Sequence, residues 1–309
     1  MFPANISQLI KEKYDLAYNN GHLKFLQTDS RTVNDSNTGM QYVVSFAPSL
    51  LKKPERGDTP KNVDPLGNSE PELTVLEDLF QDKEYKLVLN KYPIISEHSL
   101  LVTNEFKHQT SSLTSKELLQ FYELIAHLDE NNEQSRHTIF YNCGPASGSS
   151  LDHKHLQLIK LPSDLSPFQD KLLSREYHFS STIKNEEPLQ DRNISFAHFV
   201  LPLPKSTNEI DETFLQRCYK ILLQKLKTVC QNETFISHNL ILTKNWICLI
   251  PRSSTKARTL RIGFNSVGYL GIVLVKFQDV FDQIVENPQL LNSVLLECGF
   301  PNTLGQIQI

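Results

Sequence analysis

The sequence has few cysteines, no long apolar run and no excess of basic residues. Its five cysteines are scattered over 309 residues without a Cys-x-x-Cys pair, so neither a disulfide framework nor a zinc knuckle is expected. This usage favours a reducing compartment, the cytoplasm first and the nucleus as a further location. No stretch approaches the roughly 18 apolar residues of a membrane span, and the polar start of the chain is not typical of a secretion signal. A formal net charge of −4 argues against a protein that coats nucleic acid.

The chain does have enough apolar residues, 39% of the total, for a sizeable core. Helical spacing of apolar residues predicts helices over 5–20, 114–130, 211–230 and 277–299, the last with a break at Pro288. Strand-like runs occur at 22–28, 41–47, 84–92, 99–103, 137–143, 153–161, 195–204, 237–243, 246–252 and 267–276. Because a parallel array would need more crossover helices, we expect an α+β fold with a mainly antiparallel sheet flanked by helices.

Two stretches interrupt this pattern. Residues 48–72 carry five prolines, and a loop of this length is typical of either disorder or a functional segment. The polar stretch 185–193 is the best candidate for a domain boundary. We therefore predict an N-terminal catalytic domain over 1–185 and a C-terminal domain over 186–309.

The most informative stretch is 142–157, NCGPASGSSLDHKHLQ. Alternate residues of a strand share a face, so His153, His155 and Gln157 are expected to point one way and the intervening leucines towards the core. The turn before them, Gly148-Ser149-Ser150, offers backbone N–H groups that can hold phosphate oxygens. It is not a Walker loop, because neither Lys-Ser/Thr nor a helix follows its glycines.

A histidine in this setting is suited to nucleophilic catalysis. A neutral imidazole can attack phosphorus and form a labile phosphoramidate, which divides one transfer into two easier steps. A neighbouring backbone carbonyl or His153 can hold its other nitrogen and fix the tautomer, and Gln157 can donate to a phosphate oxygen. Two other interpretations stay open: a metal site in which Cys143 or His137 joins the histidines, and a solvated strand face without function.

The tract His153-x-His155-x-Gln157, preceded by the Gly-Ser-Ser turn, resembles the signature of the transferase branch of the histidine triad superfamily. Hydrolases of that superfamily have a third histidine at the place of Gln157. Four segments, 46–56, 87–103, 140–158 and 264–276, resemble those of the diadenosine tetraphosphate phosphorylases, also called ATP adenylyltransferases. The resemblance covers nearly the whole chain and implies a histidine-triad-like sheet with an ATP adenylyltransferase-like C-terminal half packed onto it.

The resemblance implies a nucleotidyltransferase that cleaves diadenosine tetraphosphate with inorganic phosphate into ADP and ATP, through a covalent adenylyl-histidine. Its ligands would be the dinucleoside polyphosphate, ATP, ADP, AMP and phosphate, and an ADP-sulfurylase side activity would be compatible. The alternatives are a hexose-1-phosphate uridylyltransferase and a non-catalytic nucleotide-binding module. The missing Cys-x-x-Cys pair, which some uridylyltransferases use for zinc, weakens the first alternative and leaves no structural metal required. A divalent cation such as Mg²⁺ can accompany the polyphosphate, and we expect a monomer that binds neither nucleic acid nor membranes.

By position, the resemblance assigns His155 as the nucleophile, with Gln157 and His153 beside it. The segments that line the nucleotide and polyphosphate site in that family match Lys52, Lys53, Asn90, Lys91, Asn142, Gly148, Ser149, Ser150, Asn265, Ser266, Val267 and Lys276. Simpler interpretations exist, since surface lysines are commonly solvated and asparagines commonly end strands or form turns. The resemblance does not decide which of the two adjacent lysines contacts the substrate.

Overall fold

The computed structural model describes residues 2–25, 28–48, 64–130, 135–174, 187–231 and 233–304. A large sheet crosses the molecule in the order β3-β4-β5-β7-β6-β9-β10-β8, and its neighbouring strands are antiparallel. The strands are β3 (Thr74–Leu76), β4 (Tyr85–Leu89), β5 (Ser99–Thr103), β6 (His137–Cys143), β7 (His155–Lys160), β8 (Phe199–Pro202), β9 (His238–Leu242) and β10 (Trp246–Pro251). The expected mainly antiparallel sheet is confirmed.

The two halves of the chain share this sheet. Strand β6 pairs with β9, which places Asn142 opposite Asn239. A smaller sheet also joins the halves: β2 (Gln41–Phe46) pairs antiparallel with β1 (Asp29–Asn34) and parallel with β11 (Ile272–Val275). The C-terminal half therefore continues both sheets strand by strand. The predicted domain boundary between 185 and 186 lies outside the described residues.

The α-helices are α1 (Ile6–Asn19), α2 (Ser115–Glu130), α3 (Phe168–Ser174), α4 (Glu212–Val229), α5 (Gln278–Glu286) and α6 (Leu290–Leu296). Helical spacing predicted all of these except α3, and Pro288 separates α5 from α6 as expected. α2 begins at a capping box, in which the Glu117 N–H donates to Thr114 Oγ1 and the Thr114 N–H donates to Glu117 Oε2. Among the helices of the described ranges, none combines the length and apolarity that a bilayer crossing requires.

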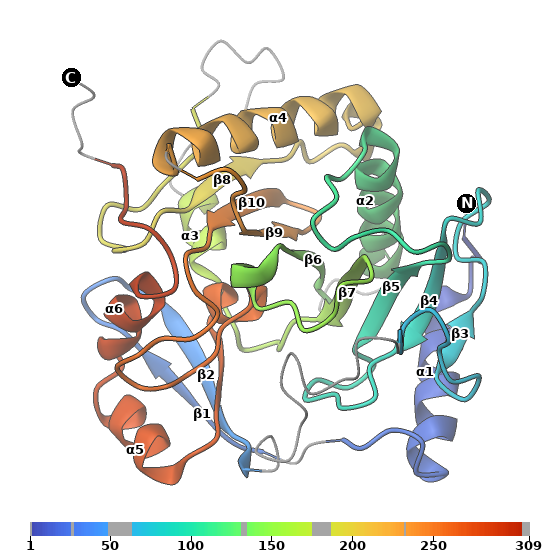
Figure 1. The fold of residues 1–309 in the computed structure, drawn as a ribbon, viewed down its shortest axis with the longest axis horizontal. Coiled ribbons are helices and arrows are strands. Elements are labelled where there is room, and N and C mark those ends of the chain that lie inside the picture. The colour runs from blue at the N-terminus through green and yellow to red at the C-terminus, as the bar shows by residue number, and fades with distance from the viewer. Residues whose placement is uncertain are drawn as a thin grey trace.

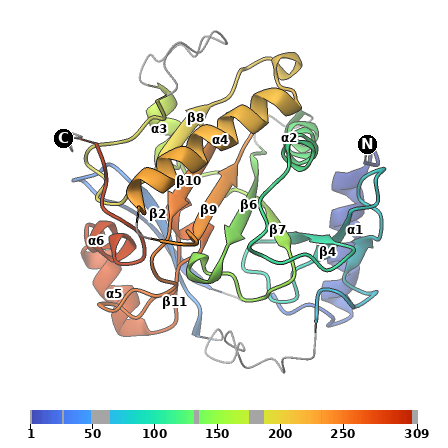
Figure 2. The ribbon, with the colours of Figure 1, turned by 45° about the horizontal axis from the view of Figure 1, so that its top comes forward.

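Different elements cover the two faces of the large sheet (Figure 1; Figure 2). On one face α2 and α4 pack over the strands, and Leu156 and Leu158 belong to the core beneath them. The opposite face, which includes Ile159, belongs to a second core shared with the small sheet, α5 and α6. Because side chains alternate along a strand, His155 and Gln157 point to this second face.

The strand expected over 22–28 is wrong. Residues 22–25 form no strand, and the first strand, β1, begins only at Asp29. β1 is polar and mostly exposed, so it lacks the alternation that would reveal it in the sequence. Its backbone pairing with β2 makes it a strand.

Candidate active site

His155 and Gln157 open into a cavity of about 420 Å³ that adjoins β4, β5 and β7. Asn90, Lys91 and Ser150 add polar groups to its wall. An apolar part of the wall is formed by Leu66, Leu73, Val88, Leu100 and Leu151. A cavity whose wall combines apolar and polar side chains suits a ligand that has both an apolar and an anionic part.

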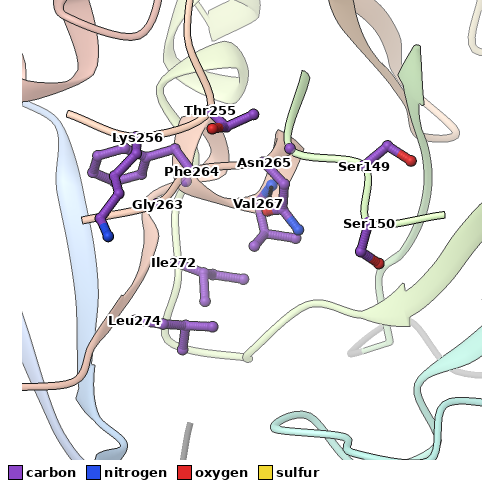
Figure 3. Close-up of a pocket in the computed structure, with 12 residues that line it drawn as sticks. Ser149, Ser150, Thr255, Lys256, Gly263, Phe264, Asn265, Val267, Ile272 and Leu274 are labelled. Carbon is purple, nitrogen blue, oxygen red and sulfur yellow. Dashed lines mark hydrogen bonds between the residues drawn. The ribbon is translucent and has the colours of Figure 1, made fainter. Parts of the chain in front are cut away.

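A second cavity, also of about 420 Å³, adjoins the first (Figure 3). It is lined by Gly148, Ser149, Ser150, Thr255, Lys256, Gly263, Phe264, Asn265, Val267, Gly268, Ile272 and Leu274. In Figure 3, Ser149 and Ser150 lie on one side of this cavity, and Ile272 and Leu274 lie across from them. Gly148, Ser150 and Asn265 belong to both walls, so the two cavities meet at the turn.

His155 is buried at the start of β7, and the backbone holds its ring. Its Nδ1 lies 2.8 Å from the backbone carbonyl of His153, one of the two partners considered from the sequence. A carbonyl only accepts, so Nδ1 carries the proton and Nε2 is the free-base nitrogen. Burial lowers the pKa of His155, which keeps the ring neutral at pH 7. A neutral imidazole nitrogen of this kind can attack phosphorus.

A hydrogen-bond chain behind the cavity orients Gln157. Asn90 Oδ1 accepts the Tyr92 N–H at 3.0 Å, so the Asn90 amide nitrogen donates to His98 Nδ1 at 3.2 Å. His98 Nε2 then donates to Gln157 Oε1 at 2.9 Å. With its oxygen held in this way, Gln157 has its amide nitrogen available to donate to a ligand.

The turn before β7 carries glycine where the backbone requires it. Gly148 has a φ of +86°, and a Cβ there would lie 2.4 Å from the Phe264 carbonyl oxygen. Only glycine combines this left-handed conformation with so close an approach. The turn can therefore pack against the segment 264–265 and place both in the walls of the cavities.

Asn142 presents an unusual buried donor. The pairing of β6 with β7 ends at Phe140 opposite Gln157, and beyond it the Gln109 side chain bridges the backbone carbonyls of Asn142 and His155. Its Oδ1 accepts hydrogen bonds from Asn239 Nδ2 at 2.8 Å, from the Ser266 N–H at 3.1 Å and from the Ser266 hydroxyl at 2.7 Å. Within the described part of the chain, Asn142 Nδ2 is buried and has no hydrogen-bond partner. Such an orphaned donor beside His155 fits an anionic ligand.

His153 lies behind the cavity and is not among the residues of its wall. Its Nδ1 lies 2.8 Å from the Asp64 carboxylate and its Nε2 lies 2.8 Å from the Thr103 carbonyl, so both ring nitrogens are engaged. Burial raises the pKa of Asp64, but hydrogen bonds from the Gly67 N–H and from His153 outweigh this and hold that pKa below its usual range. His153 thus anchors Asp64, which directly precedes Pro65 and Leu66 of the cavity wall.

The predicted lysines have separate outcomes. Lys91 lines the first cavity, where its ammonium pairs with the Glu70 carboxylate at 2.5 Å. Lys276 directly follows β11 and is not among the residues lining either cavity. Lys52 and Lys53 lie outside the described residues.

The residues of the alternative metal site are not arranged as one. His137 Nδ1 lies 2.7 Å from the Asp129 carboxylate, and burial raises the pKa of the Cys143 thiol to about 12. Across the described ranges, no group of three or more His, Cys, Asp or Glu side chains is placed to hold a metal ion.

Sequence reasoning missed Gln109, which inserts its side chain between β6 and β7. Its Nε2 donates to the carbonyls of Asn142 at 2.9 Å and His155 at 3.0 Å, and its Oε1 accepts the His155 N–H at 2.8 Å. The Gln109 side chain therefore takes the place of backbone hydrogen bonds between the two strands at Asn142 and His155. No sequence pattern marks this glutamine, because it lies in the loop between β5 and α2. His98 was within reach, since it lies in the segment 87–103 that carried the resemblance.

Fold and site together define a class: a histidine-triad-like protein with a buried histidine beside a glycine- and serine-containing turn. Models of two families match the chain, the Ap4A phosphorylase N-terminal domain over residues 1–172 and the ATP adenylyltransferase C-terminal domain over residues 192–301. Two proteins of Saccharomyces cerevisiae are similar over nearly their whole length. Protein APA1 is 51% identical over 312 residues, which covers 98% of this chain and 97% of that protein. Diadenosine 5',5'''-P1,P4-tetraphosphate phosphorylase 2 is 46% identical over 319 residues, which covers 99% and 98%.

Solved structures agree with these matches. The crystal structure of yeast Ap4A phosphorylase Apa2 is 46% identical and similar in fold with a TM-score of 0.91, over 98% of this chain and 100% of that chain. The same enzyme in complex with Ap4A gives a TM-score of 0.89 over the same shares. The chain belongs to the Ap4A phosphorylase family, where Ap4A is diadenosine tetraphosphate, and the expected histidine-triad-like fold is confirmed.

Proposed function

We propose that this chain phosphorolyses Ap4A to ADP and ATP through a covalent adenylyl-His155. The 46% identical relative is named for this activity, and structures of yeast Apa2 have been solved in complex with Ap4A and with AMP. The observation that carries the proposal lies in this chain. The His153 carbonyl holds the His155 Nδ1–H, which leaves Nε2 as the nucleophile in a cavity with a phosphate-binding turn.

In the first step His155 Nε2 attacks the phosphorus that bears one adenosine. A nitrogen–phosphorus bond forms while the bond to the bridging oxygen breaks, and ATP leaves as an anion that needs no proton. The amide nitrogens of Gln157 and Asn142 are the side-chain donors for the developing charge on the phosphorus oxygens, and the N–H groups of the 148–150 turn are the backbone donors. This step leaves AMP on His155.

In the second step an oxygen of inorganic phosphate attacks the same phosphorus. The nitrogen–phosphorus bond breaks, ADP forms, and His155 returns to the neutral ring with its proton still on Nδ1. Phosphate is already an anion at pH 7 and needs no base, whereas water does. Gln157 can neither take nor give a proton, so the site favours phosphate over water as the acceptor.

The two adjoining cavities suit the two ends of the substrate. The apolar wall of the first, with Leu66 and Leu100, would hold the adenosine of the transferred AMP. The second cavity, with Phe264 and Ile272, would hold the nucleoside end that leaves as ATP. The polyphosphate then crosses the turn at Ser150, which belongs to both walls.

Cations balance the charge of the polyphosphate. Lys91 and Lys256 belong to the two cavity walls, and the family resemblance adds Lys276 and one of Lys52 and Lys53. A divalent cation such as Mg²⁺ would be bound by the polyphosphate oxygens and would screen their charge. The enzyme would work as a monomer in the cytoplasm, a compartment that suits its buried free cysteines.

The test is incubation of the purified protein with Ap4A, with and without phosphate, followed by chromatography of the nucleotides. We expect equal amounts of ADP and ATP, formed only when phosphate is present. AMP and ATP formed without phosphate would indicate a hydrolase, and binding without products would indicate a nucleotide-binding module. Faster transfer from a uridine diphosphate hexose would favour the uridylyltransferase alternative, and ADP with sulfate tests the side activity.

A further inference from the structure

We propose that Arg252 and Asn239 are positioning residues that fix the direction of the Asn142 amide. They hold it so that its N–H donor, and not its carbonyl oxygen, faces the reacting phosphate. This inference rests on the proposed function, because it concerns how the same site recognises the phosphate of its substrate.

The chain of hydrogen bonds begins at a buried guanidinium directly after β10. Arg252 donates to Cys298 O at 2.9 Å, Ser147 O at 3.1 Å, Asn239 Oδ1 at 2.5 Å, Ser254 O at 2.7 Å and Phe264 O at 3.0 Å. A guanidinium has only donors and keeps its charge at any physiological pH. Asn239 must therefore offer Arg252 its oxygen.

The direction of the Asn239 amide follows from that constraint. With its oxygen on Arg252, its nitrogen points the other way and donates to Asn142 Oδ1 at 2.8 Å and to Ser147 O at 2.9 Å. The reversed amide would place an NH₂ group against the guanidinium and an oxygen against the Ser147 carbonyl. Arg252 therefore decides which atom Asn239 presents to Asn142.

The direction of the Asn142 amide follows in turn. Three donors converge on its oxygen, one from Asn239 and two from Ser266. Reversal would place an NH₂ group against all three donors, so Nδ2 is turned away from them. In the part of the chain that the structure describes, this buried nitrogen has no partner, and Gln109 links Asn142 to His155 by donating to both of their backbone carbonyls.

The direction matters because a phosphate offers only acceptors. An amide nitrogen beside the reacting phosphorus stabilises its oxygens, whereas a carbonyl oxygen at the same place would repel them. Asn239 and Arg252 belong to the C-terminal half and Asn142 to the N-terminal half. The series of hydrogen bonds therefore depends on the pairing of β6 with β9, which places Asn142 opposite Asn239.

The test is a double-mutant cycle of Asn239→Ala and Asn239→Asp with Asn142→Ala, scored by kcat and KM for Ap4A phosphorolysis and by equilibrium binding of AMP. Asn239→Ala removes one of the three donors to Asn142 Oδ1 and so weakens the hold on that amide. Asn239→Asp instead places an oxygen against Asn142 Oδ1, which favours the reversed amide and opposes the two remaining donors from Ser266. Asn302→Ala is the matched control, because Asn302 makes two similar side-chain bonds, to the carbonyls of Asp191 and Ile194, lines neither cavity and has no bond to Asn142 or Asn239.

We expect each Asn239 variant to lower kcat/KM about tenfold, the size of one lost hydrogen bond to a charged group. In the Asn142→Ala background the same substitutions should change kcat/KM less than about twofold, because the residue through which they act is gone. Asn302→Ala should lower the melting temperature and leave kcat/KM unchanged.

Three results would overturn the proposal: wild-type kcat/KM in a folded Asn239 variant, an undiminished loss in the Asn142→Ala background, or a similar loss in Asn302→Ala. If one Asn239 variant does not fold, the other is read through the same cycle. The wild-type reference keeps the two hypotheses apart. A wild-type protein without phosphorolysis would refute the proposed function, and the cycle would then be read from AMP binding alone.

Discussion

Lys154 and His155, at the start of β7, point to opposite faces of the large sheet. Lys154 is fully paired within the fold, whereas His155 keeps a ring nitrogen for a ligand. On the helix-covered face, the buried Lys154 ammonium pairs with Glu117 at 2.6 Å and lies 3.3 Å from the Ser112 carbonyl. The same carboxylate accepts the Tyr85 hydroxyl at 2.5 Å. This face therefore compensates its buried charge within the fold, as a buried ion pair requires.

On the site face, polar groups keep bonding capacity for a ligand. His155 uses Nδ1 for a backbone bond and presents Nε2 to the cavity, and the buried Asn142 Nδ2 is an unpaired donor in the described structure. The comparison teaches that contacts on the helix-covered face stabilise β7. Polar groups on the site face can therefore remain without hydrogen-bond partners until a ligand binds. Substitutions on the two faces should therefore separate stability from activity.

His155→Ala should have the largest effect, confined to activity. Loss of a nucleophile lowers the rate by about three or more orders of magnitude, while a cavity-lining imidazole supports little core packing. The measurement is phosphorolysis of Ap4A together with the melting temperature. Retention of more than about a tenth of the wild-type rate by the folded variant would contradict the assignment of the nucleophile.

Lys154→Met should have the opposite effect, a loss of stability with little change in activity. It leaves the Glu117 carboxylate buried without its counter-charge, which costs about 3–5 kcal/mol of unfolding free energy, while the folded fraction stays active. Chemical denaturation and activity per folded molecule measure the two effects. Replacing both partners, as Lys154→Met with Glu117→Gln, should recover part of the stability.

The pH dependence sharpens this prediction. Burial raises the pKa of Glu117, but the Lys154 ammonium together with hydrogen bonds from Tyr85 and the Thr114 N–H outweighs burial and holds that pKa below its usual 4.5 in the wild-type protein. The ion pair therefore contributes fully to wild-type stability at pH values above the usual pKa of Glu117. This contribution is lost as the pH falls through the lowered pKa of Glu117 in the folded protein. In Lys154→Met the unpaired carboxylate destabilises the protein as pH rises. The stability gap should narrow from pH 7 to about pH 4, and a constant gap would contradict the account.

Gly148→Ala should have an intermediate effect on both properties. A Cβ at this position would lie 2.4 Å from the Phe264 carbonyl oxygen, so the turn and its neighbour must separate. Gly21→Ala is the matched control, because Gly21 also has a positive φ, of +75°, with no atom within 4 Å of its Cβ. We expect about 1–2 kcal/mol of destabilisation in the control from the conformation alone, and a larger loss with lower activity in Gly148→Ala. Equal stability and full activity in both would contradict the need for close approach.

Lys91→Met should have the smallest effect, because this lysine is partly exposed and already paired with Glu70. We expect about a three- to tenfold rise in KM for Ap4A and weaker salt dependence, with little change in kcat. Lys11→Met, in the exposed pair of Lys11 with Asp15, is the control and should change neither. Unchanged kinetics in Lys91→Met would indicate a surface lysine without a role in binding.

Features that depend on residues close together in the sequence could be predicted. His155, Gln157 and the Gly148 turn lie within one short stretch, and strand alternation was enough to place these two side chains on one face. His153, which was expected on the same face, precedes β7 and does not line the cavity. The helices followed from apolar spacing, apart from the short α3. These features depend on neighbours along the chain, which a single sequence displays directly.

Long-range contacts could not be predicted in the same way. Asn239 reaches Asn142 across 97 residues, and His153 reaches Asp64 across 89. Such partners depend on the strand order of the large sheet, which apolar periodicity does not encode. The exposed edge strand β1 shows the same limit, since its backbone pairing leaves no trace in its side chains.

The most direct test of the central claim is mass spectrometry of the protein mixed with Ap4A in the absence of phosphate. The account predicts an added AMP on His155, because water is a poor acceptor at a site whose Gln157 cannot act as a base. Added phosphate should discharge this adduct as ADP. An unmodified protein that rapidly produces AMP and ATP without phosphate would contradict the claim that the site reserves adenylyl-His155 for phosphate.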